Sequence, residues 1–403
     1  MTSMPVAPCI NEALPAELFG AIFEEHAKLE WRAPVIDGLV CQQWRQTILH
    51  SPRVWAHIEI GDNFRSIPSD LRPQWLRRSG TAPLHIRVSS LRGVKEILDQ
   101  HHKRIESLTV LHALAHALLE NWSFPILQSL TVCDWDDRSP KLRLSTWDAM
   151  PALRSLRVGY TSVDILPSKT FPPLRVLALS EVKGYNYIIQ STYRSLTTLM
   201  LECLNVPNTS ETLEFPSLSF LSLFAVKNLK HRMSIPALIT YHEGLITEKE
   251  SFSMPLPLLT EYGIYELHTD PVFNPSRLHQ YYPNLSRFSV RASASSVKAF
   301  LHSLSGQPTS LPMLRILAVE FPFGIKEPSK EDKDSMMNDV SVRNTATGVK
   351  LELCFDGTRR VPLYFGEVRV YIKYGRSKLT SILRIRIYPI EDLSLILSLW
   401  SGC

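Results

Sequence analysis

A short phrase of apolar and variable positions recurs ten times between residues 104 and 320 of this 403-residue chain. It consists of an apolar residue, two variable residues, an apolar residue, one variable residue and an apolar residue. Its last positions alternate, which predicts a short strand with one buried face. The first apolar positions, separated by 20 to 29 residues, are Ile105, Leu127, Leu153, Leu174, Leu196, Leu218, Leu238, Leu259, Leu285 and Leu314.

The period of this phrase resembles that of leucine-rich repeats. One such strand cannot bury its apolar face alone, so stacked copies are expected to form a curved parallel sheet over a continuous core. The turn after each strand departs from the usual signature, which has asparagine or cysteine there. Here the position holds Trp135, Thr161, Val182, Leu204, Val226, Ile246 and Leu267. The predicted fold class is α/β with an irregular leucine-rich-repeat solenoid, and a plain mixed sheet with coincidental phrases is the alternative.

Side chains alternate across a strand, so the residue between the last two apolar positions points away from the core. Stacked repeats align these residues in one row, and the residues after the final apolar position form a second row. Aromatic residues and arginine are enriched in binding hot spots. The rows therefore predict a target-binding surface at Arg157, Met200, Phe224, His242, Tyr265 and Arg291. A bare surface, or one covered by the C-terminal segment, is the alternative.

The repeat that contains His242 is the least regular, because Glu243 stands where an apolar residue belongs. A shift of one residue in the register of this strand would exchange its two faces.

Residues 11–60 have a helical pattern instead. Leu14, Leu18 and Ile22 recur at four-residue steps, and Pro15 fits the first turn of the expected helix. A second helix is expected over about residues 34–50 and ends before Pro52. Its expected face consists of Ile36, Leu39, Val40, Trp44 and Ile48. The segment from Val54 to Ile60 then alternates as a strand does.

Three segments of this region closely resemble an F-box. They are Leu14-Pro15-x-Glu17-Leu18 followed by Ile22-Phe23, then Val40-Cys41-x-x-Trp44-Arg45, and finally Ser51-Pro52-x-x-Trp55. Their order and spacing are similar to those of F-box proteins from mushroom-forming fungi, in which leucine-rich repeats often follow the F-box. Two residues depart from the pattern: His26, where many F-boxes have an apolar residue, and Gly38 inside the second expected helix.

An F-box docks on the Skp adaptor of a cullin-RING ubiquitin ligase. The resemblance implies that Leu14, Pro15, Leu18, Ile22 and Leu39 contact this adaptor and that Trp44 and Trp55 hold the module together. A purely core role for all of them is the alternative. The implied function is a substrate-recognition subunit, whose F-box binds the ligase while the solenoid binds a target protein. The competing interpretation is a non-enzymatic scaffold whose F-box has drifted and binds no ligase.

The sequence thus predicts six segments. Residues 1–10 are a flexible N-terminus, 11–60 the small all-helical F-box, and 61–103 a junction with an edge strand at 83–90 and a capping helix at 94–103. Residues 104–322 are the solenoid, with helices at 112–122 and 293–306 on its convex side. Residues 323–340 are a mobile charged loop, and 341–403 are strands that extend or cap the sheet.

Composition narrows the classes of function. A hydrophobic fraction of 44% and a net charge of +5 are ordinary for a globular protein and too mild to indicate nucleic acid. No apolar run reaches the length of a membrane span, and no secretory signal is visible. The six cysteines are scattered without a Cys-x-x-Cys pair, which favours a cytoplasmic or nuclear protein with reduced thiols.

No pattern in the sequence predicts catalysis, a metal site or a cofactor. His112 and His116 have the helical spacing of two metal ligands, but the glutamate of a zinc-protease helix is missing between them. The basic residues Arg369, Lys373, Arg384 and Arg386 alternate with apolar ones, which favours a solvated strand face over a phosphate-binding patch. The expected partners are the Skp adaptor and an unidentified target protein, with no enzymatic activity, no membrane and no nucleic acid.

Overall fold

The computed structural model describes residues 14–355 apart from gaps at 62–65, 91–92, 134–141, 145–146, 160–162, 166–170, 181, 183–184, 205–211, 227–232, 245–254, 266–272 and 322–327. The chain divides into two units, residues 1–366 and 367–403, and every described residue belongs to the first. The predictions for residues 1–10, for the strands beyond residue 355 and for their basic residues lie outside the described residues. The same holds for the side chains of His112 and His116.

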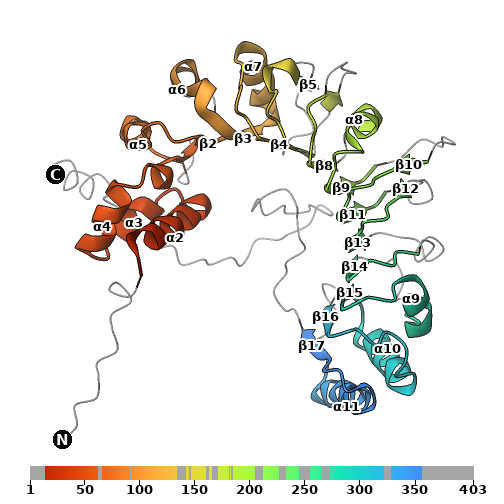
Figure 1. Cartoon of the computed structure of the whole chain (residues 1–403). Helices are drawn as coiled ribbons and strands as arrows, with labels where there is room; N and C mark the ends of the chain where they lie inside the picture. The colour runs from red at the N-terminus through yellow and green to blue at the C-terminus, as the bar shows by residue number, and fades with distance from the viewer. Residues whose placement is uncertain are drawn as a thin grey trace, which may run out of the picture. The chain divides into compact units, whose positions relative to one another are not determined.

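A 13-stranded parallel sheet is the main element of the described residues, and its strands neighbour one another in chain order. The strands β3 to β16 of this sheet are the ten predicted phrases, so the predicted parallel sheet is confirmed (Figure 1). In order, the strands are β1 (His57–Ile60), β2 (Leu84–Val88), β3 (Ile105–Leu111), β4 (Ser129–Cys133), β6 (Ser155–Gly159), β8 (Val176–Ser180), β9 (Thr198–Glu202), β11 (Phe220–Phe224), β13 (Thr240–Gly244), β14 (Glu261–Tyr265), β15 (Arg287–Arg291), β16 (Ile316–Glu320) and β17 (Glu352–Phe355).

Two short pairs of strands stand apart from this sheet. They are β5 (Leu142–Leu144) with β7 (Val163–Ile165) and β10 (Leu213–Glu214) with β12 (Met233–Ser234).

The core lies between the sheet and a set of helices on one of its sides (Figure 1). The first apolar residue of every phrase is at most 1% exposed. The capping helix and the helix at 293–306 are confirmed, and they bury Ile97, Leu98, Phe300 and Leu304. We call the opposite side of the sheet its front face. The helices are α6 (Val94–His101), α7 (His112–Asn121), α8 (Tyr185–Thr192), α9 (Pro275–Tyr281), α10 (Ala294–Gly306) and α11 (Lys330–Thr347).

The register of the strands aligns the predicted rows on the front face. Neighbouring strands pair Thr109, Thr131, Arg157, Ala178, Met200, Ser222, His242, Gly263, Ser289 and Ala318 in succession. No shift occurs in the irregular repeat, because Glu243 stands opposite Leu223 and Ile264, which are both buried. The first row is therefore continuous across the ten repeats.

Glu243 consequently points into the core and is only 2% exposed. Its carboxylate accepts a hydrogen bond of 2.6 Å from the hydroxyl of Tyr241 and another from the hydroxyl of Tyr262. Burial raises the pKa of Tyr241, Tyr262 and Tyr282, and the charge of Glu243 adds to this effect. The tyrosines therefore stay protonated and act as donors, which allows a carboxylate to occupy an apolar position.

Residues 14–56 form a small helical module. It consists of α2 (Ala16–Leu29), α3 (Ala33–Gly38), α4 (Gln42–Leu49) and the 3-10 turn η1 (Pro52–Trp55). The prediction of one helix over residues 34–50 is wrong, because Cys41 has an extended backbone and its Sγ accepts a hydrogen bond from the Trp44 amide, starting a new helix. Ile36, Leu39 and Val40 are consequently exposed and do not share a buried face with Ile48.

The four residues that directly follow the module form the first strand of the sheet, β1. β1 pairs in parallel with β2, so the predicted edge strand at residues 83–90 is an interior strand. Trp75 of α5 (Arg72–Arg78) contacts both Trp31 and Trp55, with ring centroids 5.9 and 5.1 Å apart. All three tryptophans are buried, so the module and α5 share a core at this junction.

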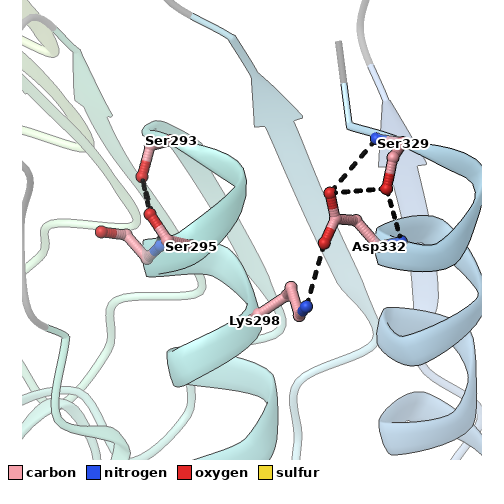
Figure 2. Close-up of polar contacts among 6 residues, drawn as sticks. Ser293, Ser295, Lys298, Ser329 and Asp332 are labelled. Carbon is pink, nitrogen blue, oxygen red and sulfur yellow. Dashed lines mark hydrogen bonds and ion pairs between the residues drawn. The ribbon is translucent and has the colours of Figure 1, made fainter. Parts of the chain in front are cut away.

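The predicted charged loop at 323–340 is wrong from residue 330 onward, where α11 begins. Ser329 and Asp332 form a capping box, and Lys298 Nζ of α10 reaches Asp332 Oδ1 at 2.9 Å (Figure 2). Met336, Val340 and Arg343 are buried on one side of the helix. These three residues have the spacing of one helix face, but the many charged residues around them make that pattern hard to recognise in the sequence.

We expect Glu243→Ala to lower the free energy of unfolding by about 2 kcal/mol or more, because each buried hydroxyl that loses its acceptor costs about 1–3 kcal/mol. Glu243→Gln keeps an acceptor oxygen and should lie between this variant and the wild type. Urea unfolding of the full chain measures both. Equal stability of the alanine and glutamine variants would contradict the role given to the tyrosine bonds.

A second prediction concerns His57 and His85, whose rings stack across β1 and β2 with centroids 4.5 Å apart. Burial lowers the pKa of His57 to about 3, and His85 and Lys28 add to the effect. An unfolded chain binds this proton near pH 6.5. The contribution of neutral His57 to the free energy of unfolding is therefore complete above about pH 6.5 and is lost progressively as the pH falls towards 3.

At pH 5, we expect the His57 contribution to be smaller by about 2 kcal/mol than at pH 7.5. His57→Phe keeps a stacked ring and should lose that part of the pH dependence in urea unfolding. His50→Phe is the control, since His50 is exposed and its imidazole bonds to the Gln46 carbonyl of the helix that it caps. Parallel pH profiles for wild type and His57→Phe would contradict the assignment.

Candidate interaction surfaces

The described residues carry no group of three or more His, Cys, Asp and Glu side chains placed to hold a metal ion. Within the same residues, no helix combines the length and the apolar character needed to cross a lipid bilayer. Two surfaces of the described residues are candidate sites: the exposed side of the helical module and the front face of the sheet.

The helical module exposes an unusual number of large apolar side chains. We call them the apolar set: Leu18, Ile22, Leu29, Ile36, Leu39 and Val40, which are between 39% and 69% exposed. Isolated exposed apolar residues are common, whereas several within one small module indicate a surface that a partner covers. Leu18, Ile22 and Leu29 lie on one side of α2 because they are four and seven residues apart.

The five residues predicted to bind the adaptor lie on or beside this set. Pro15 is exposed and directly precedes α2, where its carbonyl accepts hydrogen bonds from the amides of Leu18 and Phe19. Leu14 is half-buried. Leu18, Ile22 and Leu39 each expose about half of their surface. The sequence did not identify Leu29, Ile36 and Val40 as part of the surface. It placed Ile36 and Val40 on one helix face with Leu39 but predicted adaptor contact for Leu39 alone, and Leu29 belongs to none of the F-box-like segments.

The aromatic residues of the F-box-like segments pack inside the module. Trp55 is fully buried and donates from Nε1 to the Ile48 carbonyl at 2.9 Å. Trp44 is half-buried against Phe19 and Phe23, with centroids 5.8 and 5.0 Å away. Arg45 donates from Nε to the Gly38 carbonyl at 3.1 Å and so holds the end of α3.

The front face brings five of the six predicted target-binding residues onto successive strands. Met200, Phe224, His242, Tyr265 and Arg291 lie on β9, β11, β13, β14 and β15, which follow one another in the sheet. Arg157 lies on β6 and is separated from Met200 by β8.

Aromatic rings interlock in the middle of this group. His242 meets Phe220 and Tyr265 edge to face, with centroids 5.4 and 5.7 Å apart. His242 is only 8% exposed, so it offers a partner little contact area, contrary to the prediction. The half-buried rings around it, Phe220, Phe224 and Tyr265, offer more. Burial raises the pKa of Tyr265. Gly244 leaves room for this packing, since a Cβ there would lie 2.4 Å from the Phe224 ring.

Charges on the front face are matched between neighbouring strands. Arg291 bonds to Glu320, and Arg287 Nε lies 3.5 Å from Glu261 Oε1. The His242 imidazole, with Nε2 3.7 Å from the same oxygen, lowers the pKa of Glu261, and Arg287 adds to this effect. Burial lowers the pKa of Arg157. Arg291 is thus engaged within the sheet, which limits its predicted role as a flanking contact.

Neither a family model nor a curated protein matches the sequence.

Proposed function

We propose that this chain is a substrate-recognition subunit of a Skp-cullin-F-box ubiquitin ligase. In this proposal the helical module is an F-box that docks on the Skp adaptor through the apolar set, and the front face of the sheet binds the target protein. The chain makes no bond itself. It holds the target near the ligase, which raises the effective concentration of the target's lysines.

The observation that carries the proposal is the apolar set on a module whose segments resemble an F-box. Leu18 and Ile22 come from the first of these segments, and Leu39 and Val40 flank the start of the second. The aromatic residues of the same segments pack inward, so the module separates its core from its exposed apolar residues. Contact with a partner would remove this exposed apolar surface from water.

The target would bind where large apolar side chains gather on the front face. From β8 to β11 its side chains include Val176, Ala178, Met200, Phe220 and Phe224, and the ion pairs of β15 and β16 lie beyond them. An apolar centre with a charged rim is the usual arrangement of a protein interface.

We expect Leu18→Asp combined with Ile22→Asp to abolish binding to a purified Skp adaptor without unfolding the chain. Truncating one central apolar anchor typically costs about 2 kcal/mol or more. A buried carboxylate adds its own desolvation penalty in the complex. Biolayer interferometry measures the binding, and circular dichroism confirms that the variant folds.

The matched control is Leu258→Asp combined with Met313→Asp, two residues of the repeat region that are 54% and 45% exposed. This control should bind the adaptor as the wild type does. A folded Leu18/Ile22 variant with unchanged affinity would remove the apolar set as the docking surface. A wild-type chain that binds no adaptor would favour the scaffold interpretation.

We further expect Met200→Asp combined with Phe224→Asp to prevent capture of the target while adaptor binding persists, because both changes place charge in the apolar centre. Quantitative affinity purification compares the proteins retained by this variant and by the wild type. The control is Thr109→Asp combined with Thr131→Asp, which places two carboxylates in the same row on β3 and β4. Identical sets of retained proteins for the two variants would move the target site elsewhere.

A further inference from the structure

A histidine and an aspartate join α2 to α3 inside the helical module. His26 Nδ1 lies 2.9 and 3.1 Å from the two carboxylate oxygens of Asp37. Asp37 is buried at 8% exposure, whereas the His26 side chain keeps 43% of its surface exposed. A hydrogen bond to an ionised carboxylate is shorter and stronger than one between neutral groups, so this contact is a firm link between the helices.

The pair lies between the two halves of the apolar set. His26 is one turn after Ile22 on α2 and three residues before Leu29. Asp37 directly follows Ile36, and Leu39 comes two residues later. The contact therefore fixes the distance between the apolar side chains of α2 and those of α3 and the turn after it.

α3 depends on such links because it is only six residues long. A helix of that length is not stable by itself in water. Arg45 holds its last carbonyl, at Gly38, from the side of α4. Among the described residues, the carboxylate of Asp37 bonds to His26 alone, so this pair is the side-chain link from α3 to α2.

We propose that His26 and Asp37 are a positioning pair for the docking surface of the module. Together they place Ile36 and Leu39 at the separation from Ile22 and Leu29 that the partner requires. An apolar residue at position 26, as many F-boxes have, would leave a buried carboxylate without a donor at position 37. The buried aspartate therefore requires the histidine as its donor. This inference rests on the proposed function for the identity of the partner.

A double-mutant cycle on the full chain tests the pair, with the purified Skp adaptor as the binding partner in biolayer interferometry. We expect His26→Ala and Asp37→Ala each to weaken binding about tenfold. Because the two residues act as one unit, the double variant should be no weaker than the weaker single variant. His26→Gln keeps an N–H donor and should recover most of the affinity. His50→Ala is the matched control and should bind as the wild type does.

Hydrogen exchange of the free chain supplies a readout that does not need the adaptor. His26→Ala should raise amide exchange in residues 33–40 and leave β8 to β11 unchanged. A general loss of stability would raise exchange in both regions and overturn the positioning role. If Asp37→Ala does not fold, the comparison of His26→Gln with His26→Ala carries the test in its place.

The outcomes separate this inference from the proposed function. Additive losses in the double variant, or wild-type affinity of His26→Ala, overturn the pair while the docking surface stands. If the wild-type chain binds no adaptor, the proposed function fails, and hydrogen exchange alone decides the pair. Unchanged exchange over residues 33–40 would overturn it in that case.

Discussion

The structure depends on one constraint: a strand of five residues with a single apolar face cannot bury that face without neighbours. Each repeat supplies one strand and too little apolar surface for a core of its own. Parallel pairing in chain order brings the repeats together, and the first apolar residue of every phrase is almost completely buried. The helices behind the sheet vary in length and position because only the strands must match their neighbours in register.

This constraint also explains how the sheet accommodates Glu243. A shift of one residue would have exposed the carboxylate, but it would also have turned Tyr241 away from the core and broken the row on both sides. The sheet keeps its register instead, and tyrosine hydroxyls from β13 and β14 meet the charge inside the core. The hydrogen bonds between the many strands of the sheet thus outweigh the preference of the Glu243 carboxylate for water.

The regular parts of the fold could be predicted from the sequence because periodicity is a strong signal. The ten strands, their order and the rows of the front face follow from the spacing of the leucines. The errors occur where a few contacts outweigh local composition. The Cys41 cap divides an expected helix, Ser329 and Asp332 start α11 in a charged segment, and β1 pairs outside β2. For the candidate site, the sequence identified Leu18, Ile22 and Leu39 but missed Ile36 and Val40, because it expected one continuous helix with both on the same face as Ile48. The sequence also predicted an exposed His242, because the alternation of residues along a strand does not show which rings of neighbouring strands cover a side chain.

The two candidate surfaces differ in a way that bears on how the chain would work. On the front face, aromatic rings lie edge to face and charges are paired between strands, so the surface already satisfies much of its own chemistry. On the helical module, large apolar side chains remain exposed over a core of tryptophan and phenylalanine. Burial of apolar area favours constant association, whereas a matched and partly polar face favours selective contact. Trp75 of α5 packs against Trp31 and Trp55 of the module, so the module and the segment that leads into β2 are held together by one aromatic cluster.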